Sequence, residues 1–154
     1  MASISNDQEF KQALEKLSAV QKRVLGAMFV ERVLDLSDDS RVRRAVEVAR
    51  KPDAQETELD GVNRDAKTAA VESYTACGRD TDWHAQAAHF VATAAADCSV
   101  PPSRSAQAKN AAWDAAMFAR MARTCQKIAQ GDTEVHDEAE AQHRLLEQFL
   151  ASAA

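Results

Sequence analysis

The sequence predicts an all-α fold, with six or seven helices packed as a bundle in a single domain over residues 1–154. About a fifth of the residues are alanine, which has the highest helix propensity of the amino acids. Only four glycines and three prolines are present, too few for a series of tight β-hairpin turns. No segment combines period-two alternation with the β-branched and aromatic enrichment of a strand, so we expect no β-sheet.

Capping signals and apolar periodicity place the helices of the first half of the chain. Two capping boxes, which begin at Ser5 and Ser18, predict one long helix or two short ones before residue 36. Pro52 ends the next helix, and Gly78 stops the one after it. The expected helices are residues 6–36 (whole or divided), 40–51 and 57–77.

The second half of the chain contains one clear loop, the segment SVPPS, which separates two further helices. We expect Asp80 or Thr81 to cap the helix before this loop, and Asp132 or Thr133 to cap the last helix. Gly131 closes the helix between them. The expected helices are residues 81–98, 103–129 and 133–150.

The composition disfavours several classes of function. The net charge of −5 argues against nucleic-acid binding, because neutralising phosphates requires an excess or a cluster of Lys and Arg. No segment has the roughly 18 apolar residues of a membrane span. The polar, acidic N-terminus lacks the basic and apolar regions of a signal peptide, and three cysteines without disulfide-like spacing suggest reduced thiols. We therefore expect a cytoplasmic protein that binds neither nucleic acid nor a membrane.

The last predicted helix contains one E-x-x-H motif, formed by Glu140 and His143, and paired motifs of this type build di-iron sites in four-helix bundles. At about 100° per residue, His136 shares the helix face of this pair. That face lies on the solvent side of the apolar stripe, whereas di-iron ligands project inward. The sequence contains no second E-x-x-H. A solvated helix face is therefore favoured over a metal site, and no metal or other cofactor is expected.

Two side chains at the edges of apolar helix faces are candidates for a pocket. His84 lies beside the apolar stripe of its helix, and Asp114 lies at the edge of the large apolar face of the next helix. Each is expected to be a partly buried structural residue with a hydrogen-bond partner, and the alternative is a ligand-binding pocket. Phosphate-loop, nucleophile-elbow and zinc-protease motifs are absent from the sequence, so we expect no catalytic residues and no enzymatic activity.

Acidic residues are concentrated at the start of the last predicted helix. Such residues favour a helix N-terminus, where they compensate the helix dipole. The alternative is an acidic docking surface for a basic partner protein. The residues expected to form this surface are Glu134, Asp137, Glu138 and Glu140.

Residues 29–50, FVERVLDLSDDSRVRRAVEVAR, resemble a segment of an alanine-rich, all-helical family of bacterial proteins associated with polymorphic toxin systems. That family combines an A-E-R-V-L run, an acidic turn and an A-[IV]-E-x-A-R helix. The matching residues are Glu31, Arg32, Val33, Leu34, Asp39, Arg41, Ala45, Val46, Glu47, Ala49 and Arg50. Lys51 and Pro52 stand where an aromatic residue usually follows the arginine of this helix.

The resemblance implies an immunity protein, that is, a non-enzymatic protein that binds and neutralises a cognate toxin. Residue chemistry gives the same segment a structural role. Glu31 and Arg32 interrupt an apolar helix and are expected to reach across to neighbouring helices, while Arg44, Glu47 and Arg50 are spaced for pairs along the next helix. The alternatives are a helical-bundle protein that binds a ligand or a metal, and a homo-oligomeric scaffold.

Overall fold

The structure, a computed structural model, describes residues 3–77, 82–107 and 110–153. The elements in this part of the chain are α1 (Asp7–Glu15), α2 (Ala19–Glu31), the 3-10 helix η1 (Leu34–Leu36), α3 (Ser40–Ala49), α4 (Glu56–Cys77), α5 (Trp83–Cys98), the 3-10 helix η2 (Pro102–Gln107), α6 (Ala111–Ala129) and α7 (Glu138–Ala153). No strand occurs among the described residues, and the predicted all-α fold is confirmed. None of the helices in these ranges is long and apolar enough to cross a bilayer.

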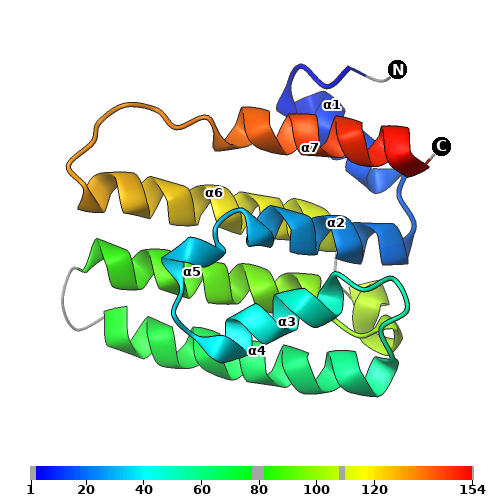
Figure 1. The fold of residues 1–154 in the computed structure, drawn as a ribbon, viewed down its shortest axis with the longest axis horizontal. Helices are drawn as coiled ribbons and strands as arrows, with labels where there is room; N and C mark the ends of the chain where they lie inside the picture. The colour runs from blue at the N-terminus through cyan, green and yellow to red at the C-terminus, as the bar shows by residue number, and fades with distance from the viewer. Residues whose placement is uncertain (1–2, 78–81, 108–109, 154) are drawn as a thin grey trace.

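Helices α4, α5 and α6 lie side by side as one antiparallel layer with α5 in the centre (Figure 1). Two helices cover one side of this layer: α3 packs across α4 and α5, and α2 packs across α5 and α6. Helices α1 and α7 pack at the edge of the bundle, against α2 and α6. Both ends of the chain therefore lie at the same end of the molecule (Figure 1).

The core has two parts that differ in the size of their side chains. Where α2 to α6 meet, the buried residues are alanine and valine for the most part. The second part, under α1 and α7, contains larger anchors: Phe10, Leu14, Phe29 and Leu146. The central layer is thus held by many small contacts, each of which contributes little, and the two terminal helices are held by a few large ones.

The predicted capping signals meet different outcomes. The capping box at Ser18 is present, since Ser18 Oγ accepts a hydrogen bond from the Gln21 amide and Gln21 Oε1 accepts one from the Ser18 amide. The cap of α1 is Asn6, one residue later than predicted. Helix α5 is capped by Asp82, which was not among the predicted caps and accepts hydrogen bonds from two amides of the first turn. Three further predicted signals, Gly78, Asp80 and Thr81, lie outside the described residues.

Two predicted helix starts are wrong. The helix expected from residue 103 begins at Ala111, because η2 occupies the preceding segment and Asn110 caps α6. The last helix begins at Glu138 rather than at residue 133. Residues 131–137 consequently form a loop, and the acidic residues expected on one helix are divided between this loop and α7.

Candidate functional site

The candidate site is built around the acidic loop, residues 131–137, which connects α6 to α7. Gly131 begins the loop in the left-handed region, with φ 70°, as the residue after the cap of a Schellman motif. Its amide donates a hydrogen bond of 3.0 Å to the Ile128 carbonyl oxygen, and the Asp132 amide donates one of 3.0 Å to the Lys127 carbonyl oxygen. These two bonds end α6 and reverse the direction of the chain.

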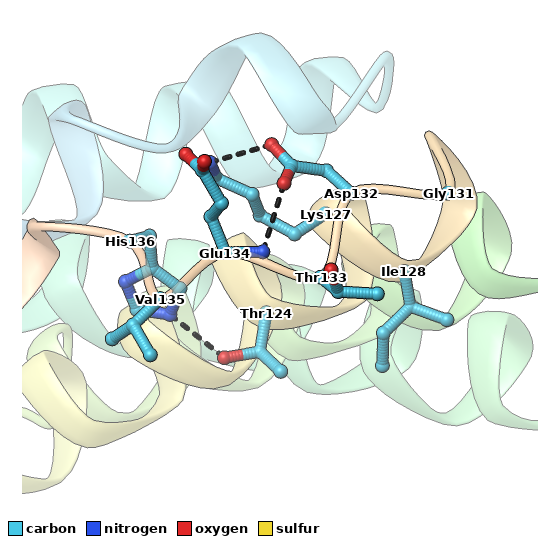
Figure 2. Close-up of a pocket in the computed structure, with 9 residues that line it drawn as sticks. All are labelled: Thr124, Lys127, Ile128, Gly131, Asp132, Thr133, Glu134, Val135 and His136. Atoms are coloured by element: carbon cyan, nitrogen blue, oxygen red, sulfur yellow. Dashed lines mark hydrogen bonds and ion pairs between the residues drawn. The ribbon is translucent and has the colours of Figure 1, made fainter.

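Side-chain contacts then hold the acidic loop against α6 (Figure 2). Lys127 Nζ lies 2.8 Å from Asp132 Oδ2, and Asp132 Oδ1 accepts a hydrogen bond of 2.9 Å from the Glu134 amide. Farther along, His136 Nε2 lies 2.8 Å from Thr124 Oγ1. Burial lowers the pKa of His136, which favours the neutral ring in this contact. The loop therefore runs back along the end of α6 and is fixed at both of its ends.

A hollow of about 520 Å³ lies between the acidic loop and α6. Ile128 and Val135 supply apolar side chains to it, and both are exposed; Val135 is 96% exposed. Small-molecule sites bury most of their ligand's surface. Because most of the side chains around this hollow are exposed, it would leave much of a small ligand's surface open to solvent. The lining residues are Thr124, Lys127, Ile128, Gly131, Asp132, Thr133, Glu134, Val135 and His136 (Figure 2).

A second hollow, of about 470 Å³, adjoins the first and is bordered by three cations, Arg32, Arg123 and Lys127. The Glu138 carboxylate lies among them, at 2.7 and 3.3 Å from the Arg32 guanidinium and 3.9 Å from that of Arg123. The Glu138 side chain is only 3% exposed. This ion pair fixes the first residue of α7, where the acidic loop ends, against the end of α2.

The acidic docking surface expected from the sequence is smaller in the structure. Glu138 does not belong to it, because this residue is buried and paired with Arg32. Glu140 is exposed on α7 and lies 3.5 Å from Arg144, one turn along the helix. Glu134 and Asp137 are exposed, and neither has an ion-pair partner among the described residues. The exposed carboxylates of the predicted surface that make no ion pair in the described part of the chain are therefore these two, both in the acidic loop.

The helix face expected to carry His136, Glu140 and His143 is not formed. His136 lies in the acidic loop, whereas the other two residues belong to α7. His143 is turned toward α1, where its Nε2 atom is 2.9 Å from Asp7 Oδ1 and its ring centroid is 5.0 Å from that of Phe10. In the described ranges, no three His, Cys, Asp or Glu side chains are grouped so that they could hold a metal ion.

His84 and Asp114 do not share a pocket. His84 is exposed at the start of α5, contrary to its expected partial burial, and Asp114 is half-buried in the first turn of α6. Because α5 and α6 are antiparallel, the two residues lie at opposite ends of the layer (Figure 1). Sequence reasoning missed the role of His89 on α5, which packs against α4. Its Nδ1 atom lies 2.9 Å from the Ala70 carbonyl oxygen and 3.1 Å from Ser73 Oγ.

Three of the five residues expected in structural ion pairs are found in them. Arg50 Nε lies 2.6 Å from Glu31 Oε1 and connects α3 to α2, and Arg32 makes the pair with the first residue of α7. The other two, Arg44 and Glu47, are exposed and make no ion pair within the described ranges. Helix α3 therefore directs these two charges to solvent.

Buried or half-buried arginines that sequence reasoning missed connect the helices to one another. Arg23 is buried and donates hydrogen bonds to carbonyl oxygens at the end of α3 and just after it, namely those of Ala49 at 3.2 Å, Lys51 and Pro52. Arg120 on α6 donates to Asp7 on α1 and to Gln142 on α7. Their partners lie far away in sequence, so no local pattern indicates these roles.

No protein-family model, curated protein or solved structure matches this chain.

Proposed function

We propose that the protein is a non-enzymatic binding protein that uses the acidic loop to hold a basic surface of a partner protein. One observation carries this proposal: Val135, an apolar residue that is 96% exposed, lies between the two exposed carboxylates Glu134 and Asp137. An apolar centre with a charged rim is the usual composition of a protein interface. The negative rim selects a partner with positive charge and accelerates its association.

The fixed geometry of the acidic loop supports the same function. The Lys127–Asp132 ion pair holds its start, and the contact between Thr124 and His136 holds its end. A loop that is already ordered loses little conformational entropy when it binds, so more of the contact energy becomes affinity.

We further infer that the partner is a toxin that this protein neutralises by occluding it. The support is the resemblance of residues 29–50 to the immunity family. This segment is also in contact with the site, because Arg32 belongs to the resembling motif and pairs with Glu138, which directly follows the acidic loop. Binding that covers the functional surface of the toxin is enough to neutralise it, so the protein needs no catalytic group for this function.

The experiment that tests this function is a pull-down from a lysate of the native host at low salt, with the full chain tagged at its N-terminus. We expect one stoichiometric partner. The double variant Glu134→Lys/Asp137→Lys should bind it at least about tenfold more weakly, a loss of about 1.4 kcal/mol. If the partner is a toxin, co-expression of the wild-type chain should restore growth of cells that produce it, and the double variant should restore it less.

A matched control separates the acidic loop from net charge. Glu15→Lys/Asp65→Lys changes the charge by the same amount at two exposed positions that make no ion pair in the described part of the chain. This control should leave affinity within about twofold of wild type, because distant surface charges are screened at ordinary ionic strength. Equal losses in both double variants would contradict the loop as the binding surface, and the absence of any partner would contradict the function itself.

A further inference from the structure

The side of the central layer that faces away from α2 and α3, here called the outer face, collects exposed apolar side chains. Among the described residues six large apolar side chains are exposed, and one of them, Val20, lies elsewhere, on α2. Of the other five, Val71 and Tyr74 lie on α4 and Met121 lies on α6, whereas Ile128 and Val135 line the hollow beside the acidic loop and are not counted in the outer face. Exposed apolar side chains that gather in one region mark interaction surfaces.

Aromatic contacts make the outer face continuous across α5. The ring centroid of Tyr74 lies 5.5 Å from that of His89, and Phe90 lies 5.7 Å from His89 and 6.1 Å from Phe118. Phe90 and Phe118 are half-buried. Helix α5 contains no Asp, Glu, Lys or Arg before Asp97. Across α5 the surface is therefore uncharged up to Asp97, while Lys67 and Glu72 are exposed charged residues in the second half of α4.

The carboxylates of Asp97 and Asp114 border the outer face where α5 ends. Asp97 lies seven residues after Phe90, which is two helical turns or about 10 Å along α5. Burial and the neighbouring charge of Asp114 raise the pKa of Asp97 to about 6, and the charge of Lys67 opposes them only in part. The Asp97 side chain makes no hydrogen bond with a described residue. A cation brought beside Asp97 would therefore offset an unfavourable negative charge.

We propose that the outer face binds an amphipathic helix of a partner protein, whose apolar side covers Tyr74, Phe90 and Met121 and whose Lys or Arg, two turns away, pairs with Asp97. Helices that lie in apolar surfaces present anchors at positions i, i+3, i+4 and i+7. The uncharged surface followed by a carboxylate matches such a helix with a basic residue at one end. This surface is distinct from the acidic loop, and the inference goes beyond the proposed function by assigning the type of segment that is bound.

Charge argues against a second copy of the chain as the occupant. In a two-fold symmetric contact each surface meets itself. With two α5 helices crossing in opposite directions, Asp97 of each copy would face the start of the other α5, which is capped by the carboxylate of Asp82. Two copies of net charge −5 also repel each other. A basic helix meets neither obstacle.

The probe for this proposal is a fluorescein-labelled synthetic peptide of about 20 residues, long enough to form a helix. It carries leucines at i, i+3, i+4 and i+7 and a lysine at i+11, with alanine and glutamine elsewhere. Fluorescence anisotropy should show binding to the full-length protein. The same peptide with glutamate in place of the lysine should bind at least about tenfold more weakly, the change that about 1.4 kcal/mol produces.

Protein variants assign the binding to the outer face. Met121→Glu should weaken binding of the lysine peptide at least about tenfold. Its control is Val20→Glu, since Val20 is 42% exposed and Met121 is 43% exposed, and this variant should bind like wild type. The variant Asp97→Asn should still bind both peptides through their leucines, but it should bind the lysine peptide no more tightly than the glutamate peptide. Glu134→Lys/Asp137→Lys, which tests the acidic loop, should still bind the peptide.

Three results would overturn the proposal. Equal binding of the lysine and glutamate peptides would remove the role of Asp97. Equal effects of Met121→Glu and Val20→Glu, or no binding by the wild-type protein, would remove the outer face. A wild-type dimer in light scattering that Met121→Glu converts to a monomer would show that a second copy occupies this surface.

Discussion

Gly61 and Gly131 show how the same residue type has opposite effects in two backbone settings. Gly61 lies inside α4, and a Cβ added there would meet nothing within 4 Å. Gly131 has φ 70°, where an L side chain is strained whatever the space around it. The first glycine thus lowers helix stability without a visible benefit, while the second allows α6 to end and the acidic loop to begin.

We therefore predict opposite changes in the free energy of unfolding for two alanine substitutions. Gly61→Ala should raise it by about 0.5–1 kcal/mol, the difference in helix propensity between the two residues. Gly131→Ala should lower it by about 1–2 kcal/mol, the cost of a left-handed backbone for an L residue. Urea denaturation followed by circular dichroism measures both. A Gly131→Ala protein as stable as wild type would mean that α6 can end in another way.

At the scale of the elements, α1 depends on a few long-range contacts. It has only nine residues, too short to be stable alone, so tertiary contacts must hold it. Phe10 and Leu14 are fully buried, and Asp7 accepts hydrogen bonds of 2.8 and 2.9 Å from Arg120. Arg120 also donates to Gln142 at 2.7 Å, so a single side chain connects α1, α6 and α7.

The Asp7–Arg120 pair should make stability depend on pH in the acid range. The hydrogen bond from Arg120 holds the pKa of Asp7 near 2, below its usual value of 3.8. The stabilisation is therefore complete above pH 3.8 and is lost as the pH falls toward 2. Asp7→Asn should lower the free energy of unfolding at pH 7 by at most about 1 kcal/mol, because the side chain is half-exposed, and the difference from wild type should shrink at pH 3.

Urea denaturation at both pH values measures this effect. Asp65→Asn serves as the control for removing one negative charge, since Asp65 is exposed and has no ion pair among the described residues. A difference between Asp7→Asn and wild type that persists undiminished at pH 3 would show that the carboxylate charge is not the cause.

The elements also show how far sequence reasoning reaches. The capping box at Ser18 is predictable because both of its hydrogen bonds join residues three apart. Asp132 is an equally good local signal, and its carboxylate does accept a hydrogen bond from the Glu134 amide. The helix nevertheless begins only at Glu138, whose partner Arg32 is 106 residues away. Such contacts leave no local pattern, so the exposure of Glu134 and Asp137 and the burial of Glu138 require the fold.

At the scale of the whole molecule, the Arg32–Glu138 pair joins two segments that are 106 residues apart in the sequence. Arg32 follows α2, and Glu138 begins α7 at the point where the acidic loop ends. The Glu138 carboxylate is buried, with Arg32 as its close partner and Arg123 at 3.9 Å. A core made largely of alanine offers few large side chains to fix how helices sit on one another. An ion pair with a buried carboxylate, such as this one, has directional contacts that specify such an arrangement.

Loss of Arg32 should therefore be costly, while replacement of the whole pair should not. We predict that Arg32→Met lowers the free energy of unfolding by about 3 kcal/mol, because it leaves a buried carboxylate without its close partner. The double variant Arg32→Met/Glu138→Leu should recover most of this loss. Arg50→Met is the matched control, since both members of the Arg50–Glu31 pair are exposed, and it should cost less than about 1 kcal/mol.

A double-mutant cycle in urea measures the coupling between Arg32 and Glu138. Hydrogen exchange at the Glu134 amide, which donates to Asp132, reports on the acidic loop in the same proteins. If the pair fixes the loop as well as the bundle, the double variant should be stable and yet exchange this amide faster than wild type. It should then also bind the partner protein more weakly, because the loop must be ordered on binding. Slow exchange in the stable double variant would mean that the contacts of the loop with α6, Lys127–Asp132 and Thr124–His136, hold it without the Arg32–Glu138 pair, and partner affinity should then be unchanged.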